Sequence, residues 1–130
     1  LVSRAPRALT CPLCWSVLMA NFLEQNYVEH DVLFAIGGFD GREPLAAIEV
    51  LDLTTSSWES GPAMATPRRG FGAVAFRNWV FVVGGFGDGC LESVEVLRVS
   101  AGTWQDGPPL AERRRDLALA VAGGEFFALG

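Results

Sequence analysis

An internal repeat constrains this chain more than any other feature of its sequence. The segments that begin at Ile48 and Val94 align at a constant offset of 46 residues, and the same offset relates Trp58 to Trp104. Together the two copies occupy residues 31–130 of the 130-residue chain. Self-similarity at a fixed spacing of this size predicts an array of stacked supersecondary units rather than one irregular domain.

Two double glycines belong to the repeat. Gly37-Gly38 and Gly84-Gly85 each follow a short apolar run, and they are 47 residues apart because the first copy has one more residue in the next loop. A length change of one residue is typical of a surface connection. Glycine reaches backbone conformations that side chains exclude, and it lets neighbouring chain approach closely. We therefore predict a structural role for all four glycines.

Each copy contains four short strand candidates joined by turns. The small-residue strands 70–76 and 116–122 come first, followed by the apolar strands 32–36, 79–83 and 125–129, the strands 47–51 and 93–97, and a short strand ending at Trp58 or Trp104. The two-residue links at 77–78 and 123–124 contain Asn or Gly, as tight antiparallel hairpins prefer. No window after residue 31 has helical spacing. The predicted fold class is all-β, with two four-stranded antiparallel sheets and the start of a third.

Composition and charge exclude several classes of partner. The net charge is −5, from fifteen acidic and ten basic residues, which argues against nucleic acid as a partner. No apolar run reaches the roughly 20 residues of a membrane helix, so no membrane role is expected. Three cysteines do not describe a disulfide framework, and free thiols favour a cytoplasmic location. The alternative is a secretory signal, because Arg4 and Arg7 precede the apolar stretch 11–23.

The residues that enzymes use for chemistry are sparse. Cys11 and Cys14 have metal-ligand spacing, but His30 is the only histidine and no second such pair follows. Four zinc ligands are therefore lacking, and we expect two ordinary thiols and no metal. Tyr27 and His30 both precede the repeats, which leaves the repeats without a histidine base for nucleophilic catalysis. The glycine-rich stretch at 84–89 is not a phosphate-binding motif. We expect no cofactor and no enzyme activity.

The combined pattern resembles the kelch repeat family. That motif has an apolar strand ending in Gly-Gly, a second strand, a Trp, and a Met-Pro-Arg sequence before a Gly-rich strand. The matching residues are FAIGG at 34–38, EVLD at 49–52, Trp58, Met64 and Pro67-Arg68, then FVVGG at 81–85, EVLR at 95–98, Trp104 and Arg114. Leu51 and Leu97 depart from the usual Tyr. The resemblance implies a β-propeller of four-stranded blades, of which this chain contains about two and the start of another.

The resemblance also implies a division of the chain and a role. Residues 1–30 do not match the repeat and are expected to be a linker or remnant, and 31–130 are expected to be kelch repeats. The implied function is a protein-interaction scaffold whose loop rim binds a protein or an acidic peptide, with the substrate receptor of a cullin-type ubiquitin ligase as one such role. The alternatives are an actin-binding kelch protein, a propeller enzyme whose active site lies on other blades, or a truncated product without independent function.

Two sets of loops would build the binding rim in a kelch propeller. Residue by residue, they point to a set of rim positions: Phe39, Gly41 and Phe86 after the double glycines, and Arg69, Gly70, Arg115 and Asp116 before the innermost strands. An exposed Phe beside an Arg suits a binding hot spot, although Phe39 and Phe86 could instead pack under their own loops. For Arg68 and Arg114 we favour a structural role over binding. Trp58 and Trp104 are expected in the core.

Overall fold

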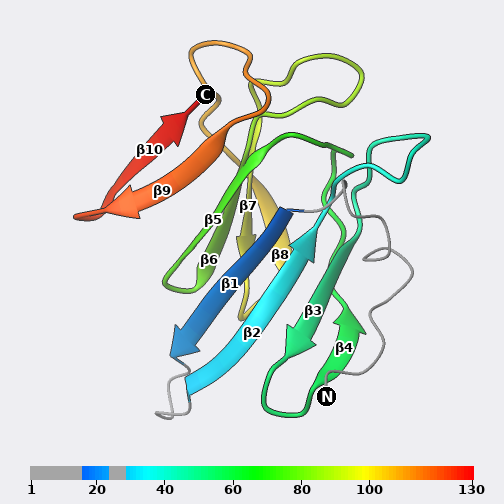
Figure 1. Ribbon diagram of the computed structural model, residues 1–130. Helices are drawn as coiled ribbons and strands as arrows, with labels where there is room; N and C mark the ends of the chain where they lie inside the picture. Colours follow the sequence, from blue (N-terminus) through cyan, green and yellow to red (C-terminus); the bar gives the residue numbers. More distant parts are fainter. Residues whose placement is uncertain (1–15, 24–28) are drawn as a thin grey trace.

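The described strands form three antiparallel sheets (Figure 1). The computed structural model describes residues 16–23 and 29–130, and side-chain surroundings from residue 32 onward. The first sheet contains β1 (Ser16–Leu23), β2 (Glu29–Ile36), β3 (Ile48–Asp52) and β4 (Ser57–Ser60). The second contains β5 (Gly72–Phe76), β6 (Trp79–Val83), β7 (Val94–Arg98) and β8 (Thr103–Gly107), and the third contains β9 (Ala118–Ala122) and β10 (Glu125–Leu129). The predicted two four-stranded sheets and the start of a third are confirmed.

The two repeat copies fold alike down to single hydrogen bonds. Arg68 N donates to Leu45 O at 3.0 Å, and the equivalent bond from Arg114 N to Leu91 O is also 3.0 Å. In each four-stranded sheet the order follows the sequence, so every strand pairs with its chain neighbour. An array of equivalent units is therefore the correct description of residues 31–130.

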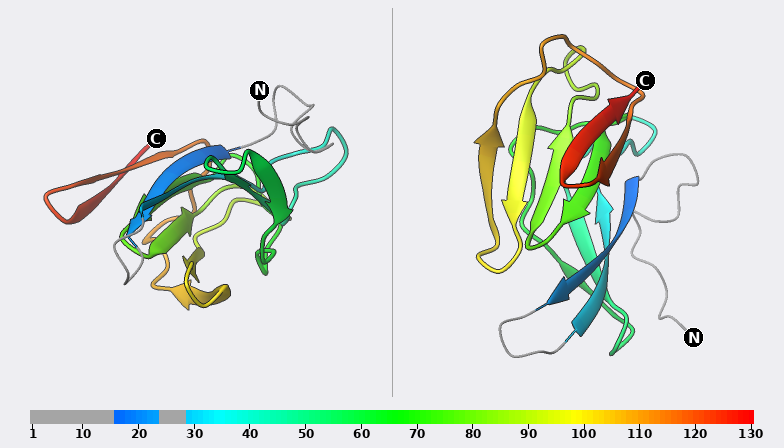
Figure 2. Two further views of the ribbon diagram at one scale, coloured as in Figure 1. Left: turned by 90° about the horizontal axis from the view of Figure 1, so that it is seen from below. Right: turned by 90° about the vertical axis from the view of Figure 1, so that its left-hand side faces the viewer.

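The sheets lie side by side, with their innermost strands in contact. β1 contacts β5, and β5 contacts β9; Figure 2 shows the resulting fan of sheets. Close approach requires small residues there, because a Cβ added at Gly72 of β5 would lie 2.7 Å from Leu119 Cγ of β9. The main core fills the space between the first and second sheets, where Phe34, Ile36, Val80 and Leu97 belong to one buried cluster.

The structure corrects two details of the predicted elements. The fourth strands do not end at Trp58 and Trp104 but continue to Ser60 and Gly107. In the turn between β5 and β6 the positive φ belongs to Arg77 (54°), whereas the sequence had suggested Asn78 as the residue suited to it. A tight hairpin needs left-handed backbone, and here Arg77 adopts it.

The segment 1–30, set apart as a linker or remnant, contains a strand of the first sheet. β1 pairs antiparallel with β2 along its whole length, from Ser16 opposite Ile36 to Leu23 opposite Glu29. It occupies the place in the first sheet that β5 has in the second. Cys11, Cys14 and Tyr27 lie outside the described residues. None of the described residues forms a helix long and apolar enough to span a membrane.

Candidate interaction rim

Four loops gather at one end of the sheets. Figure 1 shows the links that follow β2 and β6, together with those that precede β5 and β9, at the end of the molecule near the C-terminus. The links after β2 and β6 begin with the double glycines, and the other two contain the arginine runs. Loops held by a rigid sheet scaffold are where binding residues concentrate.

Two phenylalanines and two arginines alternate across these loops, and we call them the Phe–Arg stack: Phe39, Arg69, Phe86 and Arg115. The Arg69 guanidinium carbon lies 4.6 Å from the centroid of the Phe39 ring and 5.2 Å from that of Phe86. The Arg115 guanidinium carbon lies 5.5 Å from the same Phe86 centroid. Each such cation–π contact stabilises an exposed pair by about 0.5–1 kcal/mol. The three Arg–Phe contacts therefore help to hold the four side chains in place.

Backbone bonds fix the positions of the stack residues. Arg69 N donates to Phe86 O at 3.0 Å and Phe86 N donates to Arg69 O at 2.8 Å, so these two residues form an antiparallel bridge. In the loop after Phe39, the Asp40 carboxylate accepts hydrogen bonds from Arg42 N and Glu43 N at 2.8 and 2.9 Å. These bonds stabilise the ionised form and lower the pKa of Asp40.

The remaining predicted rim positions lie beside the stack. Gly41 is exposed, has a φ of +97°, and faces open space. Gly70 and Asp116 are repeat equivalents with φ of 58° and 54°, and Asp116 N donates to Gly70 O at 2.6 Å. The Asp116 carboxylate also pairs with Arg115, with 3.6 Å between Oδ2 and Nε. Asp116 thus moderates the charge at the Arg115 end of the stack.

Arg68, one residue before Arg69, has a different environment. Its side chain is 0% exposed. Its Nη1 donates to Gly84 O at 2.8 Å and Ser93 O at 3.1 Å, and its Nη2 donates to Ser93 Oγ at 3.0 Å and Glu95 Oε2 at 2.5 Å. Desolvation lowers the pKa of Arg68, while Glu95 acts in the opposite direction. The backbone of Arg68 is bonded to Leu45 of the first repeat copy, while its guanidinium is bonded to residues of the second. Arg68 therefore connects the first sheet to the second.

Glu95 is the structural residue that the sequence interpretation missed. Besides Arg68, its carboxylate accepts Ala65 N at 2.7 Å and Thr66 N at 3.2 Å. The signal was present in the repeat, because Glu49 precedes Glu95 by the offset of 46 residues. A charged residue recurring within an apolar strand indicates a paired, buried group.

The other predicted structural residues range from buried to exposed, and the two tryptophans expected in the core, Trp58 and Trp104, are only partly buried. Trp104 Nε1 donates to Pro62 O at 2.7 Å, whereas the equivalent Trp58 Nε1 is buried and has no hydrogen-bond partner within residues 16–23 and 29–130. The Arg114 side chain is 43% exposed and donates from Nη1 to Gly130 O at 3.3 Å. All four glycines of the two pairs are buried and have positive φ. A Cβ at Gly85 would lie 2.7 Å from Arg69 O, so the second pair permits the bridge beneath the stack.

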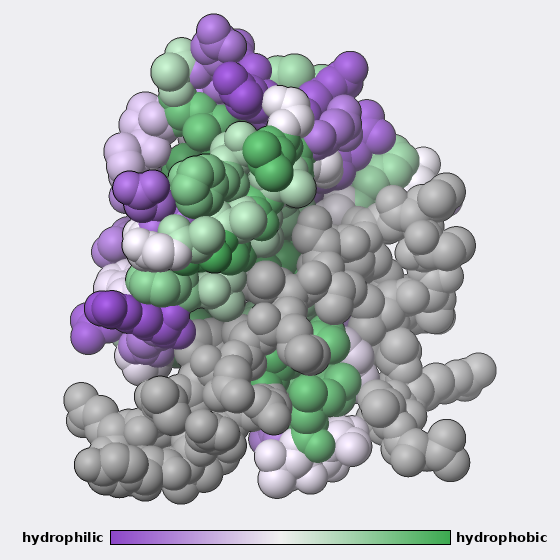
Figure 3. All heavy atoms as spheres, turned by 60° about the vertical axis from the view of Figure 1, so that its left-hand side comes forward, coloured by the Kyte–Doolittle hydropathy of each residue, from purple (hydrophilic) through white to green (hydrophobic). Residues whose placement is uncertain are grey.

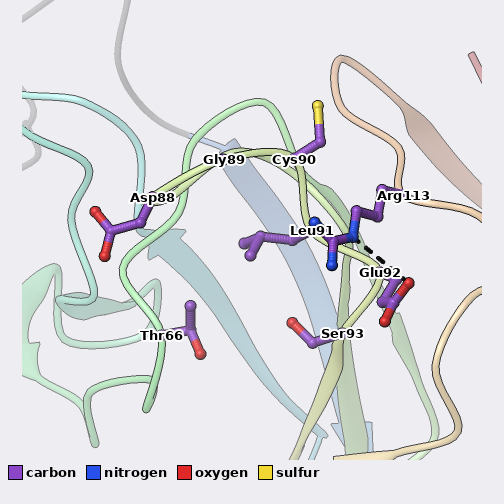
Figure 4. A pocket seen from close by; sticks show the side chains of 8 residues that line it. All are labelled: Thr66, Asp88, Gly89, Cys90, Leu91, Glu92, Ser93 and Arg113. Carbon is purple, nitrogen blue, oxygen red and sulfur yellow. Dashed lines mark ion pairs between the residues drawn. The ribbon is translucent and has the colours of Figure 1, made fainter.

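A pocket of about 320 Å³ is lined by residues 88–93, in the loop that follows Phe86, together with Thr66 and Arg113 (Figure 4). Arg113 and Glu92 face each other across part of it, 3.8 Å apart, and Cys90 forms the bridge partner of Phe86. Arg113 and Glu92 are both largely exposed. No group of three or more His, Cys, Asp or Glu side chains that could hold a metal occurs in the described part of the chain.

The comparison with known families agrees with this architecture. The model of the kelch motif matches residues 30–65 and 67–111, which is more than half of the chain. The chain belongs to the kelch family. Its first sheet is therefore blade 1 (β1–β4), its second is blade 2 (β5–β8), and the hairpin β9–β10 begins blade 3. Kelch repeats build propeller scaffolds that bind proteins, and the stack lies on the loop rim of these kelch blades.

Proposed function

We propose that this chain is a non-catalytic kelch scaffold whose Phe–Arg stack binds an acidic segment of a partner protein. The alternation of two rings with two guanidinium groups carries the proposal. Stacking uses the flat face of a guanidinium and leaves its in-plane N–H donors for a carboxylate. Flanking rings add apolar contact area, and aromatic residues with arginine are the usual hot-spot residues of interfaces.

The hydrogen-bonding state of the two arginines supports this assignment. No side chain in the described part of the chain forms a hydrogen bond or ion pair with the Arg69 guanidinium, which is half-buried between Phe39 and Phe86. The Arg115 Nε lies 3.6 Å from Oδ2 of Asp116, and both side chains are more than half exposed. An exposed pair of this length is weak and easily exchanged for a partner carboxylate. Arginine remains protonated at neutral pH, which suits it to binding rather than to proton transfer.

The cellular role that we propose rests on the family. Kelch substrate receptors present such a rim to the proteins that a cullin-type ubiquitin ligase modifies, and we propose the same role for this chain, in the cytoplasm. The local arrangement is consistent with it, because a short acidic motif would engage both guanidinium groups of the stack while its neighbouring residues contact the rings. The chain has a net charge of −5, so the two arginines of the stack form a local positive site on an otherwise acidic protein.

Selection from a random-peptide display library against the immobilised 130-residue chain tests the proposal. We expect the selected peptides to be enriched in Asp and Glu. The double variant Arg69→Ala with Arg115→Ala should lose that enrichment, and the affinity of a selected peptide for it should fall about tenfold or more, as expected when charge-assisted hydrogen bonds are removed.

Arg98→Ala is the matched control, because Arg98 also lies over an aromatic ring, that of Trp79, but at the opposite end of blade 2. This variant should select the same peptides as the parent chain. Selection of the same acidic peptides by the double variant, or loss of enrichment in the Arg98 variant alone, would refute the proposal. Circular dichroism of each variant establishes that the fold is retained.

A further inference from the structure

Arg69 contacts both rings of the Phe–Arg stack, at the boundary between blades 1 and 2. Its guanidinium carbon lies 4.6 Å from the centroid of the Phe39 ring and 5.2 Å from that of the Phe86 ring. All three residues are half-buried, so each still presents surface to solvent. Figure 3 shows hydrophilic residues gathered at the top of the molecule, the end that carries the rim loops. The two rings are therefore apolar positions within a polar end of the molecule.

The backbone that carries these side chains is already paired. The N–H groups of Arg69 and Phe86 each donate to the carbonyl oxygen of the other residue, at 3.0 and 2.8 Å. Phe39 forms a further antiparallel bridge with Pro44 in the loop after β2. An incoming segment thus finds no free N–H at Arg69 or Phe86. Recognition at this place must therefore depend on side chains rather than on the addition of a strand.

The spacing of the three side chains fits alternate residues of an extended segment. Residues two apart in an extended chain share a face and are about 6.5–7 Å apart along it, while the residue between them points away. A carboxylate that binds the Arg69 guanidinium in its plane leaves the side chains two residues before and two residues after it beside the rings. The ring centroids, 4.6 and 5.2 Å from the guanidinium carbon, are within reach of those two side chains.

Acidic groups next to the rings determine which residues suit the two flanking places. Asp40 follows Phe39 directly, and Asp88 comes two residues after Phe86; both are exposed. The Asp40 carboxylate is held in the loop by the hydrogen bonds from the backbone of Arg42 and Glu43. Further acidic residues in the segment would be repelled by these carboxylates, whereas apolar side chains would gain contact with the rings.

We propose that the stack selects segments of a partner protein with the pattern apolar-x-acidic-x-apolar, in which x is any residue. The carboxylate binds Arg69, and the apolar side chains two residues away on either side pack on Phe39 and Phe86. This inference rests on the proposed function and adds the residues that must flank the acidic one. Charge attracts acidic segments in general, and contact with the rings discriminates among them.

Three labelled peptides of equal length and charge test the flanking residues. Each has one central Glu in a neutral, polar sequence. The first carries Leu two residues before and two residues after the Glu, the second carries the same leucines directly beside it, and the third has Ser in place of both. Fluorescence anisotropy measures their affinities for the 130-residue chain. We expect the first peptide to bind about tenfold or more tighter than the others, because only its leucines are removed from water by the rings.

Substitutions in the chain assign each leucine to a ring. Phe39→Ala should remove the advantage of one leucine and Phe86→Ala that of the other, as measured with peptides in which a single leucine is replaced by serine. Phe76→Ala is the matched control, because the Arg77 guanidinium carbon likewise lies 5.2 Å from the Phe76 centroid, but at the turn between β5 and β6. This variant should retain the full preference for the first peptide.

The outcomes separate this inference from the proposed function. Equal affinities for the first and second peptides, both lost in the Arg69→Ala variant, would overturn the flanking pattern and leave the acidic binding site intact. Peptide binding that persists in the Arg69→Ala variant would overturn both. Absence of binding by all three peptides, or a preference for the first peptide that survives both Phe39→Ala and Phe86→Ala, would also overturn the inference.

Discussion

Arg68 and Glu95 form a buried ion pair across the boundary between the two kelch blades, with Nη2 and Oε2 2.5 Å apart and side chains 0% and 3% exposed. Arg68 lies in the link that leaves blade 1, and Glu95 lies on β7 of blade 2. The Glu95 carboxylate also binds two backbone N–H groups of the same link. The pair therefore fixes how one blade sits on the next, and with it the spacing of the loops that form the stack.

We predict that Glu95→Ala destabilises the chain by about 3–5 kcal/mol, because the charge on Arg68 is left buried without a partner. Urea denaturation followed by tryptophan fluorescence measures this free energy of unfolding. Glu92→Ala provides the comparison, since the exposed pair of Glu92 with Arg113 should contribute about 0–1 kcal/mol. Equal effects of the two substitutions would show that the blade boundary does not depend on the buried pair.

Glu49 is the equivalent of Glu95 on blade 1, and its buried Oε2 has no hydrogen-bond partner among the residues that the structure describes. Desolvation raises the pKa of Glu49 above its ordinary value. In the pH range between the ordinary and the raised pKa, the folded chain holds a proton that the unfolded chain has lost. The free energy of unfolding therefore falls as pH rises through that range.

Glu49→Gln removes this pH dependence. We predict that the variant is more stable than the parent at neutral pH and that the difference disappears at pH values below the ordinary pKa of a glutamate. Thermal melts recorded across acidic and neutral pH measure the effect. Glu59→Gln, an exposed change on β4 of the same blade, serves as the control. A Glu49→Gln variant that loses stability at neutral pH would contradict the assignment.

The two repeat tryptophans should respond differently to replacement by phenylalanine. Trp104 Nε1 donates to Pro62 O, whereas the buried Trp58 Nε1 has no acceptor in the described part of the chain. Trp104→Phe loses that hydrogen bond together with ring area, and Trp58→Phe loses ring area alone. We predict that Trp104→Phe costs about 1 kcal/mol more in the free energy of unfolding. A chemical denaturation series gives both values, and a larger cost at Trp58 would run against the observed bonding.

Two glycines with nearly the same φ allow the effect of steric crowding on stability to be measured separately from that of backbone strain. Gly84 has a φ of +62° and Gly102 has a φ of +65°. A Cβ at Gly84 would lie 2.6 Å from Arg114 O, while one at Gly102 would meet nothing within 4 Å. Gly102→Ala should cost about 1–2 kcal/mol from left-handed backbone alone. Gly84→Ala should lower the free energy of unfolding clearly more than Gly102→Ala, as measured by thermal unfolding of both variants. Equal losses would contradict the close packing of Gly84 against the backbone at Arg114.

Much of the fold could be predicted because the same sequence pattern occurs in two copies, so that each copy supports the interpretation of the other. The spacing of Trp58 and Trp104, with the double glycines, located the units and their strand order. The ends of β4 and β8 could not be located, because exposed polar residues at 59–60 and 105–106 resemble turns. β1 was missed because its sequence does not match β5, although both occupy the same place in their sheets.

The rim residues were named from the resemblance, but their mutual geometry required the structure. No sequence pattern shows that Arg69 lies between Phe39 and Phe86, since the three residues come from different loops. The adjacent arginines Arg68 and Arg69 have opposite environments, one buried and one in the stack, because successive residues of an extended link point in opposite directions. Glu95 could have been found from its recurrence with Glu49.

The most direct test of the rim follows the arginine side-chain Nε–Hε signals by NMR while an acidic peptide from the display selection is titrated into the chain. We predict that the signals of Arg69 and Arg115 shift together and saturate at the same peptide concentration, while that of Arg98 stays in place. Saturable shifts at Arg98, with those of Arg69 and Arg115 unchanged, would contradict the claim that the Phe–Arg stack is the binding site.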